Sequence, residues 1–286
     1  MKYQNRTVWI TGASSGIGQA LARSFAAQGA RLVLSGRRTD ALEGLAQELD
    51  TESLVLPFEA TDFSALPSAV TTAWDWRDGV DLLINNAGVS QRSLAIDTEF
   101  DVYRRLMEVD YFAPMRLTQL ILPRLIEQGH GQLAVVSSVA GKVGVPLLSG
   151  YSAAKHACVG YFDALRAEVE LAYNIQVSVI LPGSVRTNVA VNALGADGSA
   201  RGRSDANIDA GMSPDVAATI IVDGLTAGLR EIPVAQGAEL TALTLRATDP
   251  ETLFAVTAQE GARLAEARSA GIAVLDPGRR DAEDQT

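Results

Sequence analysis

Short runs of apolar residues alternate with longer amphipathic stretches along most of the chain. The apolar runs are rich in Val, Leu and Ile and lack polar alternation, which is typical of strands buried on both faces of a parallel sheet. We predict seven such strands, at residues 7–11, 31–35, 53–58, 81–85, 132–137, 176–181 and 232–235.

The stretches between these strands carry apolar residues at helical spacing. We predict helices at residues 19–28, 39–49, 62–76, 98–127, 150–173 and 213–229, with Pro114 bending or dividing the fourth. Strands that alternate with helices, joined by right-handed crossovers, predict the α/β class. We expect a single Rossmann-like, doubly wound parallel sheet of about seven strands with helices on both faces.

Three segments lie outside this alternation. Residues 184–211, within a sheet domain of residues 1–235, are rich in small and polar side chains and could form a mobile lid over a ligand crevice. Residues 236–275 are expected to form a C-terminal extension of the same domain, with a helix at 250–268. The polar tail at 276–286 has the composition of a disordered segment.

Composition narrows the class of protein. The chain has 286 residues, 47% of them hydrophobic and 20% charged, which is typical of a soluble globular protein. The net charge of −10 argues against nucleic acid or an anionic membrane as a partner. No apolar run reaches the roughly 18 residues of a membrane span, and no leader precedes the first strand. We therefore expect a cytoplasmic protein.

The cysteine and histidine content agrees with that expectation. Cys158 is the only cysteine, which excludes an internal disulfide and suits a reducing compartment. His130 and His156 are the only histidines, so no metal site of the usual Cys/His type can be assembled.

A glycine-rich turn follows the first predicted strand and precedes the first helix. Gly12, Gly16 and Gly18 permit a tight turn and the close approach of a pyrophosphate, which a helix N-terminus attracts. Gly12, Ser14 and Gly16 also match the nucleophile elbow of serine hydrolases, although such an enzyme needs a histidine partner. The phosphate-loop interpretation is favoured, and the absence of GxxxxGK[ST] argues against a nucleotide triphosphatase.

The end of the second strand carries Arg37 and Arg38 and no acidic residue. A carboxylate at this place would bind the ribose 2′-hydroxyl of NAD, whereas an arginine accommodates a 2′-phosphate. The pattern favours NADP(H) over NAD(H); a solvated basic turn is the alternative.

A candidate catalytic set lies around the fifth strand and the helix after it. Tyr151 and Lys155 are four residues apart and share one face of a helix, and Ser138 follows the strand. The ammonium would favour the phenolate of Tyr151, and the serine would hold a substrate oxygen. The alternative is a Tyr and a Lys on an ordinary amphipathic helix.

Five motifs occur in sequence: TGASSGIG at 11–18, NNAG at 85–88, Ser138, YSAAK at 151–155 and PGSVRT at 182–187. Together they resemble the short-chain dehydrogenase/reductase family over residues 6–229. The stretches around 90–112 and 151–170 look most like the branch of membrane-anchored steroid and retinoid reductases. This chain would be a soluble relative that lacks the anchor.

The resemblance implies a role for each matching residue. Tyr151 would be the general acid/base, Lys155 would lower its pKa and bind the nicotinamide ribose, and Ser138 would orient the carbonyl. Glu59 stands where the family usually has an aspartate against adenine. The implied cofactor contacts are Gly12, Ser14, Ser15, Gly16, Ile17, Gly18, Arg37, Arg38, Glu59, Ala60, Asn86, Ala87, Gly88, Tyr151, Lys155, Pro182, Gly183, Val185 and Thr187.

Asp110 is the sharper departure, because the family has a catalytic asparagine at this place. If the backbone carbonyl performs the asparagine's role, aspartate can substitute for it. If the charge matters, a carboxylate near Lys155 would raise the pKa of Tyr151. We expect activity with an altered pH optimum.

The sequence therefore predicts an NADP(H)-dependent oxidoreductase that interconverts a ketone and a secondary alcohol, on a bulky apolar small molecule. Imines or quinones could use the same residues. The alternatives are a cofactor-binding sensor or scaffold with little turnover, motivated by Asp110, and a hydrolase that uses Ser14. The family resemblance implies a homodimer or homotetramer.

Overall fold

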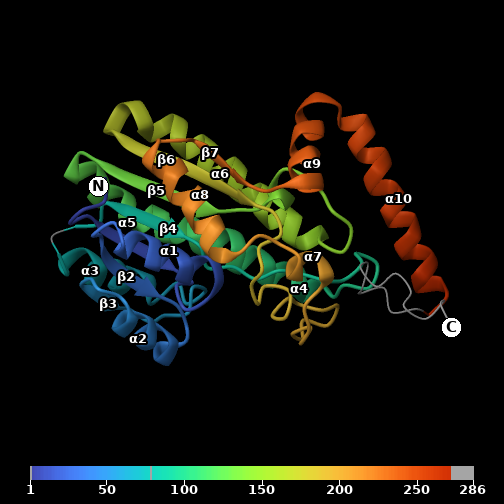
Figure 1. Ribbon diagram of the computed structural model, residues 1–286, viewed down its shortest axis with the longest axis horizontal. Helices are drawn as coiled ribbons and strands as arrows, with labels where there is room; N and C mark the ends of the chain where they lie inside the picture. Colours follow the sequence, from blue (N-terminus) through green and yellow to red (C-terminus); the bar gives the residue numbers. More distant parts are fainter. Residues whose placement is uncertain (1, 78, 272–286) are drawn as a thin grey trace.

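A seven-stranded sheet forms the centre of the protein (Figure 1). The computed structural model describes residues 2–77 and 79–271. All neighbouring strands are parallel, in the order β3-β2-β1-β4-β5-β6-β7. The strands are Thr7–Thr11 (β1), Arg31–Ser35 (β2), Ser53–Val55 (β3), Leu82–Asn85 (β4), Gly131–Val136 (β5), Ile175–Pro182 (β6) and Glu231–Val234 (β7). The predicted α/β fold class is confirmed.

The strand order reverses between β1 and β4, since β2 and β3 extend the sheet on one side and β4 to β7 on the other. Connections that leave two adjacent strands in opposite directions open a crevice at their carboxyl ends. Thr11 and Asn85 end β1 and β4 at this crevice, and β5 ends close to Ser138. The fold thus gathers the predicted motifs at one edge of the sheet.

Helices cover both faces of the sheet, because each strand presents apolar side chains alternately to either side. Val8 and Ile10 belong to one buried cluster, and Trp9 between them belongs to the other. The helices that pack in the first cluster are α1 (Gly16–Ala26), α2 (Thr39–Glu48) and α8 (Pro214–Thr226). Those in the second are α3 (Leu66–Asp75), α5 (Ala113–Gln128) and α6 (Ser149–Tyr173).

Two predicted boundaries around β3 are wrong. The strand ends at Val55 rather than at residue 58, and α3 begins at Leu66 rather than at residue 62. The Asp62 carboxylate accepts hydrogen bonds from the N–H groups of Ser64 and Ala65. This short polar turn competes with the helix, as aspartate side chains commonly do at turns.

The helix predicted at 98–127 is divided into α4 (Phe100–Met107), a π-helical turn η1 (Glu108–Phe112) and α5. The division lies at the π turn, where the Ala113 N–H bonds to the Glu108 carbonyl. Pro114 is the second residue of α5, and because the backbone is helical on both sides of it, its missing N–H leaves one carbonyl of the π turn without a helical donor. Asp110 lies within the π turn and is fully buried.

The C-terminal part of the described chain is a helical hairpin of α9 (Gly237–Thr248) and α10 (Pro250–Ser269) at the right of Figure 1. The helix predicted at 250–268 is observed as α10, whereas α9 was not predicted. The segment 184–211 contains the single turn α7 (Ala206–Asp209) and the isolated bridge Leu194–Ala200. Its role as a lid stays a prediction, and the tail at 276–286 lies outside the described residues.

Candidate active site

Ser138 lies between the ends of β5 and β6, at the start of the short helix η2 (Val139–Gly141). Its hydroxyl accepts a hydrogen bond from the Ala140 N–H at 3.0 Å and donates one to the Pro182 carbonyl at 3.3 Å. By turning its hydrogen away from Pro182, the hydroxyl can donate to a substrate oxygen.

Tyr151 and Lys155 lie on the first turns of α6 and share one face, as predicted. The Lys155 Nζ atom is 5.6 Å from the centre of the Tyr151 ring. The α6 N-terminus is held by Gln91, whose Oε1 accepts hydrogen bonds from the N–H groups of Gly150 at 2.8 Å and Tyr151 at 3.2 Å. The sequence prediction missed Gln91, because no local pattern links it to a helix that begins almost sixty residues later.

Burial raises the pKa of the Tyr151 phenol above its usual value. The Lys155 ammonium lowers that pKa, as predicted, whereas the Asp110 carboxylate raises it, and Ser138 adds a smaller lowering. The net shift is upward, so the phenol carries its proton at neutral pH. In this state Tyr151 is suited to donate a proton.

Asp110 and Lys155 form a buried ion pair beneath Tyr151. The distance from Lys155 Nζ to Asp110 Oδ1 is 3.3 Å, and the two side chains are 5% and 0% exposed. Lys155 also donates to the Val136 carbonyl at 3.0 Å, and Asp110 Oδ1 accepts from the Val89 N–H at 3.0 Å. Asp110 Oδ2 is buried with no hydrogen-bond partner.

The two members of the pair respond differently to burial. Burial lowers the pKa of Lys155, but the neighbouring Asp110 carboxylate raises it and the net shift is upward, so the ammonium persists well above neutral pH. Burial raises the pKa of Asp110, and Lys155 offsets only part of that rise. The arrangement places a fixed positive charge, with a carboxylate behind it, under the phenol.

Cys158 contacts the backbone of the π turn. Its thiol donates a hydrogen bond to the Asp110 carbonyl at 2.8 Å, and burial raises the pKa of the thiol to about 12. The carbonyl that could have taken over the family asparagine's role therefore already has a partner. The sequence offered one signal for this contact, since Cys158 is three residues from Lys155 on the same helix.

The glycine-rich turn meets the NNAG segment at the crevice. Gly12 and Gly16 have φ values of 66° and 58°, in the left-handed region that favours glycine. A side chain at Gly18 would collide with the Gly12 carbonyl oxygen. The α1 N-terminus has no side-chain cap at Ser15, which leaves N–H groups of its first turn, including that of Ile17, for an anion.

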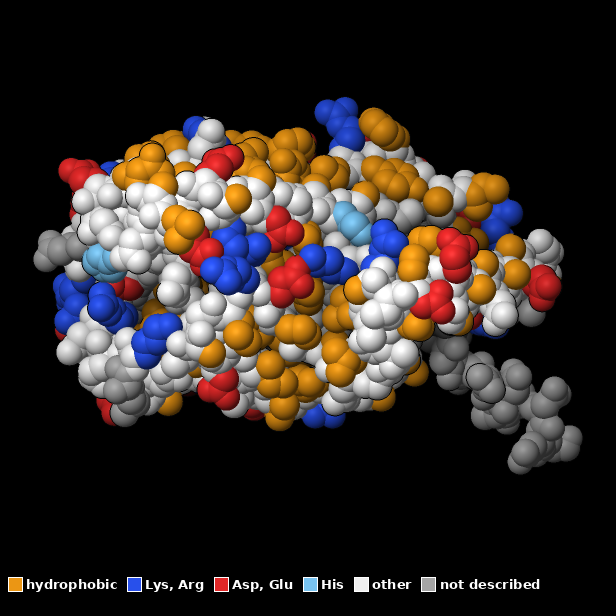
Figure 2. Space-filling view, turned by 90° about the horizontal axis from the view of Figure 1, so that it is seen from above, with side chains coloured by type: hydrophobic (Ala, Val, Ile, Leu, Met, Phe, Trp, Pro, Cys, Tyr) orange, Lys and Arg blue, Asp and Glu red, His pale blue; other side chains and the backbone are white. Residues whose placement is uncertain are grey.

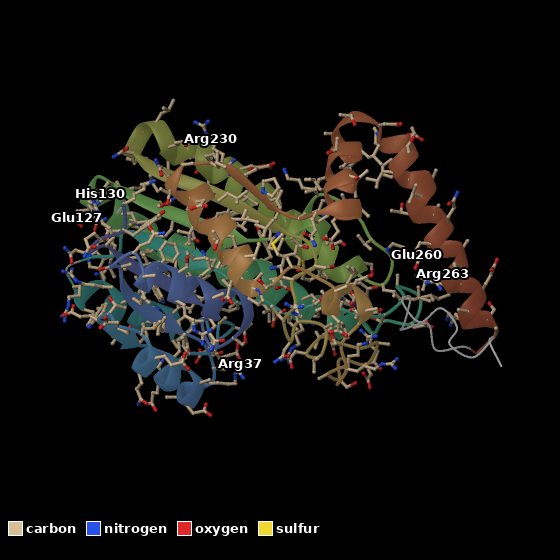
Figure 3. All side chains as sticks on the ribbon, viewed as in Figure 1. Arg37, Glu127, His130, Arg230, Glu260 and Arg263 are labelled. Carbon is tan, nitrogen blue, oxygen red and sulfur yellow. The ribbon has the colours of Figure 1, made fainter. Side chains whose placement is uncertain are left out.

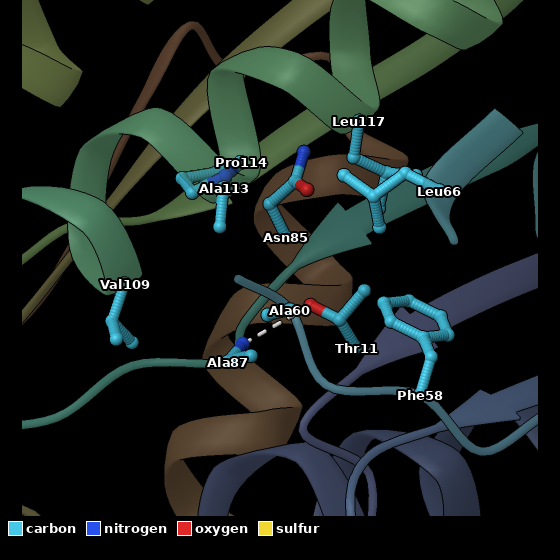
Figure 4. A pocket seen from close by; sticks show the side chains of 10 residues that line it. All are labelled: Thr11, Phe58, Ala60, Leu66, Asn85, Ala87, Val109, Ala113, Pro114 and Leu117. Carbon is cyan, nitrogen blue, oxygen red and sulfur yellow. Dashed lines mark hydrogen bonds between the residues drawn. The ribbon is translucent and has the colours of Figure 1, made fainter. Parts of the chain in front are cut away.

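Asn86 and Ala87 are tied to the end of β1 by hydrogen bonds. The Thr11 hydroxyl accepts from the Asn86 N–H at 3.0 Å and from the Ala87 N–H at 3.1 Å, the latter drawn in Figure 4. Ala60 and Ala87 line the same small pocket, with Val109 from the π turn (Figure 4). Gly88 follows at a place where a side chain would lie 2.6 Å from Asp110 Oδ1.

The two arginines after β2 differ in their contacts. The Arg38 Nη2 atom donates to the Ser14 carbonyl at 3.0 Å and to the Ser14 hydroxyl at 3.2 Å. Arg37 instead lies 3.6 Å from Glu59 and is 68% exposed (Figure 3). Arg38 therefore borders the glycine-rich turn, whereas Arg37 forms an exposed ion pair with the Glu59 carboxylate.

The PGSVRT segment closes the crevice from the β6 side. Gly183 pairs with β7 through its N–H to the Val234 carbonyl at 3.0 Å, and Val185 is buried. Thr187 reaches the glycine-rich turn, where a side chain at Gly16 would lie 3.0 Å from Thr187 Cγ2. The predicted cofactor residues from β1, β4 and β6 thus meet at one place.

Glu239 of α9 binds the PGSVRT segment at Ser184. Its carboxylate accepts hydrogen bonds from the Ser184 N–H at 2.8 and 2.9 Å and from the Ser184 hydroxyl at 2.6 Å. A side chain at Gly183 would collide with the same carboxylate. The prediction missed Glu239, because a contact between residues 55 apart leaves no local pattern.

The hydrolase alternative gains no support from the geometry. Ser14 bonds to Arg38, whereas His130 lies near Gln128 and His156 bonds to the Ser152 carbonyl. Within residues 2–77 and 79–271, no group of three His, Cys, Asp or Glu side chains could hold a metal ion. Across the same residues, no helix has the length and apolar character that crossing a membrane requires.

Comparison with known proteins defines the class. The short chain dehydrogenase family profile matches residues 6–196. The chain is 38% identical to dehydrogenase/reductase SDR family member 7B of Mus musculus over 273 residues, which cover 93% of this chain and 84% of that protein. It is 37% identical to an SDR family protein 7-like of Drosophila melanogaster over 266 residues, which cover 91% of this chain and 81% of that protein.

Solved structures agree with this result. A short-chain dehydrogenase from Streptomyces avermitilis superposes with a TM-score of 0.74 at 26% identity, covering 94% of this chain and 98% of that one. A Burkholderia phymatum short chain dehydrogenase/reductase in complex with NAD gives 0.78 at 22% identity, covering 88% and 96%, which shows the shared fold. The chain belongs to the short-chain dehydrogenase/reductase family, whose members are oxidoreductases with a nicotinamide-binding fold.

Proposed function

We propose that this protein is an NADP(H)-dependent oxidoreductase that interconverts a ketone and a secondary alcohol. The observation that carries the proposal is the convergence of Ser138, Tyr151 and Lys155 at the carboxyl end of β5. A hydroxyl donor, a protonated phenol and a buried ammonium are the groups that proton transfer to a carbonyl oxygen needs.

In the reduction, Ser138 donates a hydrogen bond to the substrate oxygen and Tyr151 delivers the proton to it. The Lys155 ammonium stabilises the phenolate left on Tyr151, and Asp110 and Val136 hold that ammonium in place. In the oxidation, the same phenolate takes the alcohol proton. A nicotinamide cofactor, when bound, would supply or accept the hydride.

The residues present suit a dinucleotide. The Gly12–Gly18 turn and the uncapped α1 N-terminus would hold the pyrophosphate, and the segments 86–88 and 182–187 would line the nicotinamide half. Arg38 would bind the 2′-phosphate that distinguishes NADP(H), because it already borders Ser14 of the turn.

The cofactor proposal has a matched pair of variants. We expect Arg38→Ala to raise the KM for NADPH about tenfold, as loss of one charged hydrogen bond does, with little change for NADH. Arg37→Ala, which removes the exposed neighbour paired with Glu59, should change the NADPH KM less. Equal effects of Arg38→Ala on NADPH and NADH would contradict the assignment.

A second candidate is a cofactor-binding sensor with little turnover. The observation that favours it is the Asp110 carboxylate. Burial raises the pKa of Tyr151, and the carboxylate raises it further. An upward shift hinders the phenolate needed for alcohol oxidation. The same shift keeps the proton needed for ketone reduction, so the oxidoreductase remains the better-supported function.

The test is oxidation of NADPH and of NADH by the purified protein with a panel of bulky and small ketones. Turnover that falls by about 10²- to 10⁴-fold in Tyr151→Phe, the usual contribution of a general acid, would support the proposal. Cofactor binding without ketone-dependent oxidation, unchanged in Asp110→Asn, would exclude it. Restored turnover in Asp110→Asn would favour the sensor.

Two further expectations stay proposals. Exposed apolar residues such as Phe100 of α4, Phe112 of the π turn and Leu171 of α6 support association into a homodimer or homotetramer, which light scattering in solution would test. The buried, unpaired Cys158 suits the cytoplasm, where thiols stay reduced.

A further inference from the structure

Uncharged polar side chains are buried in the segment between β4 and α4, where Ser90, Gln91 and Ser93 are 3%, 0% and 4% exposed. On the face of the molecule in Figure 2, charged side chains of both signs lie among apolar ones at the surface. A carboxamide below such a surface is cut off from water, so it must find its hydrogen-bond partners within the protein. The partners of Gln91 therefore indicate what this side chain does.

The Gln91 side chain caps the catalytic helix from a distant part of the chain. The N–H groups in the first turn of a helix have no helical partner. Leu148, the residue before α6, has an apolar side chain and cannot bind them. Gln91 Oε1 instead accepts hydrogen bonds from the Gly150 N–H at 2.8 Å and the Tyr151 N–H at 3.2 Å. The backbone of the proposed general acid is therefore bonded directly to Gln91.

The amide nitrogen of the same side chain fixes the orientation of the carboxamide. Gln91 Nε2 donates to the Ser93 hydroxyl at 3.1 Å and to the Thr98 hydroxyl at 3.3 Å. The Thr98 hydroxyl in turn donates to the Leu94 carbonyl at 2.7 Å. A carboxamide has two N–H donors and room for two bonds at its oxygen, and Gln91 uses all four. The side chain therefore cannot rotate without breaking hydrogen bonds.

The backbone that leads into α6 is strained and is held by the same segment. Leu147 has a φ of 68°, in the left-handed region that a leucine rarely adopts. Its carbonyl accepts a hydrogen bond from the Ser93 N–H at 3.1 Å. A strained conformation persists only where its surroundings over-determine it, and such positions cluster at functional sites. Gln91 and Ser93 thus fix the start of α6 on both sides of Leu148.

The backbone around Gln91 is itself fixed by residues of the segment 184–211. The Leu194 N–H donates to the Ser90 carbonyl at 2.8 Å, and the Leu194 carbonyl accepts from the Arg92 N–H at 2.9 Å. The Leu194 side chain is buried in a small cluster against which Tyr151 packs. Gln91 therefore joins a rigid backbone on one side to Tyr151 on the other.

We propose that Gln91 is a positioning residue that holds the Tyr151 phenol in place for proton transfer. It acts through the backbone at the start of α6 and touches neither substrate nor cofactor, because its carboxamide is fully buried and all of its hydrogen bonds are made. A displacement of reacting groups by about 1 Å can cost about 10²-fold in rate. The inference rests on the proposed reductase function and extends it to a residue outside the five motifs.

The test compares Gln91→Met with Gln132→Met, since methionine keeps the length of the side chain and removes its hydrogen bonds. Gln132 is a matched carboxamide, 6% exposed, which accepts from the Tyr3 hydroxyl at 3.1 Å and donates to the Leu225 carbonyl at 3.2 Å. It lies at the opposite end of β5 from Ser138. The substrate is the ketone that the native protein reduces fastest.

We expect Gln91→Met to lower kcat about 10- to 100-fold and to leave the Kd for NADPH within about twofold, because the cofactor site is intact and the acid is misplaced. Gln132→Met should leave both values within about twofold, as expected for a residue remote from the reaction. An unchanged kcat in Gln91→Met, or an equal loss in Gln132→Met, would overturn the proposal.

Two further variants separate positioning from a general loss of structure. Gln91→Glu keeps an acceptor oxygen for the two N–H groups of α6 and should retain kcat within about threefold of the native value. In Tyr151→Phe, which has no phenol to position, adding Gln91→Met should cost no more than about twofold. An equal fold loss with and without the Tyr151 hydroxyl would overturn the proposal.

NMR of the protein labelled with ¹³C at the Cζ atoms of tyrosine reports on the phenol without turnover, and Tyr151→Phe identifies its signal. We expect this signal to shift in Gln91→Met and to stay in place in Gln132→Met. If no ketone is reduced but this pattern holds, the reductase function fails and the positioning role stands. If the native protein reduces ketones and the signal does not move in Gln91→Met, the positioning role fails.

Discussion

Two ion pairs of similar chemistry lie in opposite surroundings. Lys155 and Asp110 pair beneath Tyr151 with side chains 5% and 0% exposed, whereas Arg268 of α10 and Asp97 pair with 45% and 37% exposed. The Arg268 pair has the better geometry, with contacts of 2.6 to 3.0 Å against 3.3 Å. From the contact distances alone, the exposed Arg268–Asp97 pair would be expected to contribute more to stability.

Burial reverses the expected contributions of the two pairs to stability. A buried ion without its partner cannot be hydrated, so removing one member costs several kcal/mol, whereas water and salt screen an exposed pair. The stability of the catalytic end of the sheet therefore depends on the buried Lys155–Asp110 ion pair. The hairpin depends on buried apolar and hydrogen-bonded contacts such as Leu253 and Glu239, with Arg268 as a minor addition. Figure 3 also labels Glu260 and Arg263, a further exposed pair on α10.

The largest effect is expected from Lys155→Met. The variant leaves the Asp110 carboxylate buried without a counter-charge, and we expect the free energy of unfolding to fall by about 3–5 kcal/mol. Urea denaturation measures the loss. The double variant Lys155→Met/Asp110→Asn, which removes both charges, should recover part of the lost stability. A loss below about 1 kcal/mol in Lys155→Met would contradict the view that the buried pair contributes more than the exposed one.

Glu239→Ala comes next, because it breaks the hydrogen-bonded link between the hairpin and the PGSVRT segment. Loss of hydrogen bonds to a charged acceptor should lower the free energy of unfolding by about 1.5–3 kcal/mol, together with weaker cofactor binding. Glu251→Ala, at an exposed acidic residue in the first turn of α10, is the control and should stay within about 0.5 kcal/mol. Equal losses of unfolding free energy in the two variants would show that the hydrogen bonds between Glu239 and Ser184 do not contribute to stability.

Asp110→Asn tests the electrostatic side of the buried pair. The carboxylate raises the pKa of Tyr151, so its removal should lower that pKa. Ketone reduction, which needs the phenol, should then decline at lower pH than in the native protein. Alcohol oxidation, which needs the phenolate, should begin at lower pH. Overlapping pH–rate profiles for the two proteins would show that the charge has no part in catalysis.

The smallest effect is expected from Arg268→Ala. An exposed pair contributes about 0.2–1 kcal/mol and is weakened by salt. The difference in unfolding free energy from the native protein should therefore shrink further in high salt. A loss as large as that of Lys155→Met would mean that the surface pair, rather than the buried contacts, holds the hairpin.

Local sequence patterns were sufficient to predict most of the strands of the sheet. The strands β1, β2 and β4 to β7 lie within about a residue of their predicted bounds, because a buried parallel strand reads as a short apolar run. Ser138, Tyr151 and Lys155 converge as predicted, since the carboxyl ends of parallel strands share one edge. The prediction failed where local signals compete, as at Asp62, and it left the net pKa shift of Tyr151 open, because burial depends on the tertiary structure.

The sequence by itself determined the α/β class, the order of the motifs and the face shared by Tyr151 and Lys155, because strand and helix periods are local properties of the chain. Only the tertiary structure decided which distant groups meet. It paired Asp110 with Lys155, gave the Asp110 carbonyl to Cys158, and fixed α9 to Ser184 through Glu239. Such contacts depend on burial and on packing between segments far apart in the chain, and neither leaves a periodic trace in the sequence.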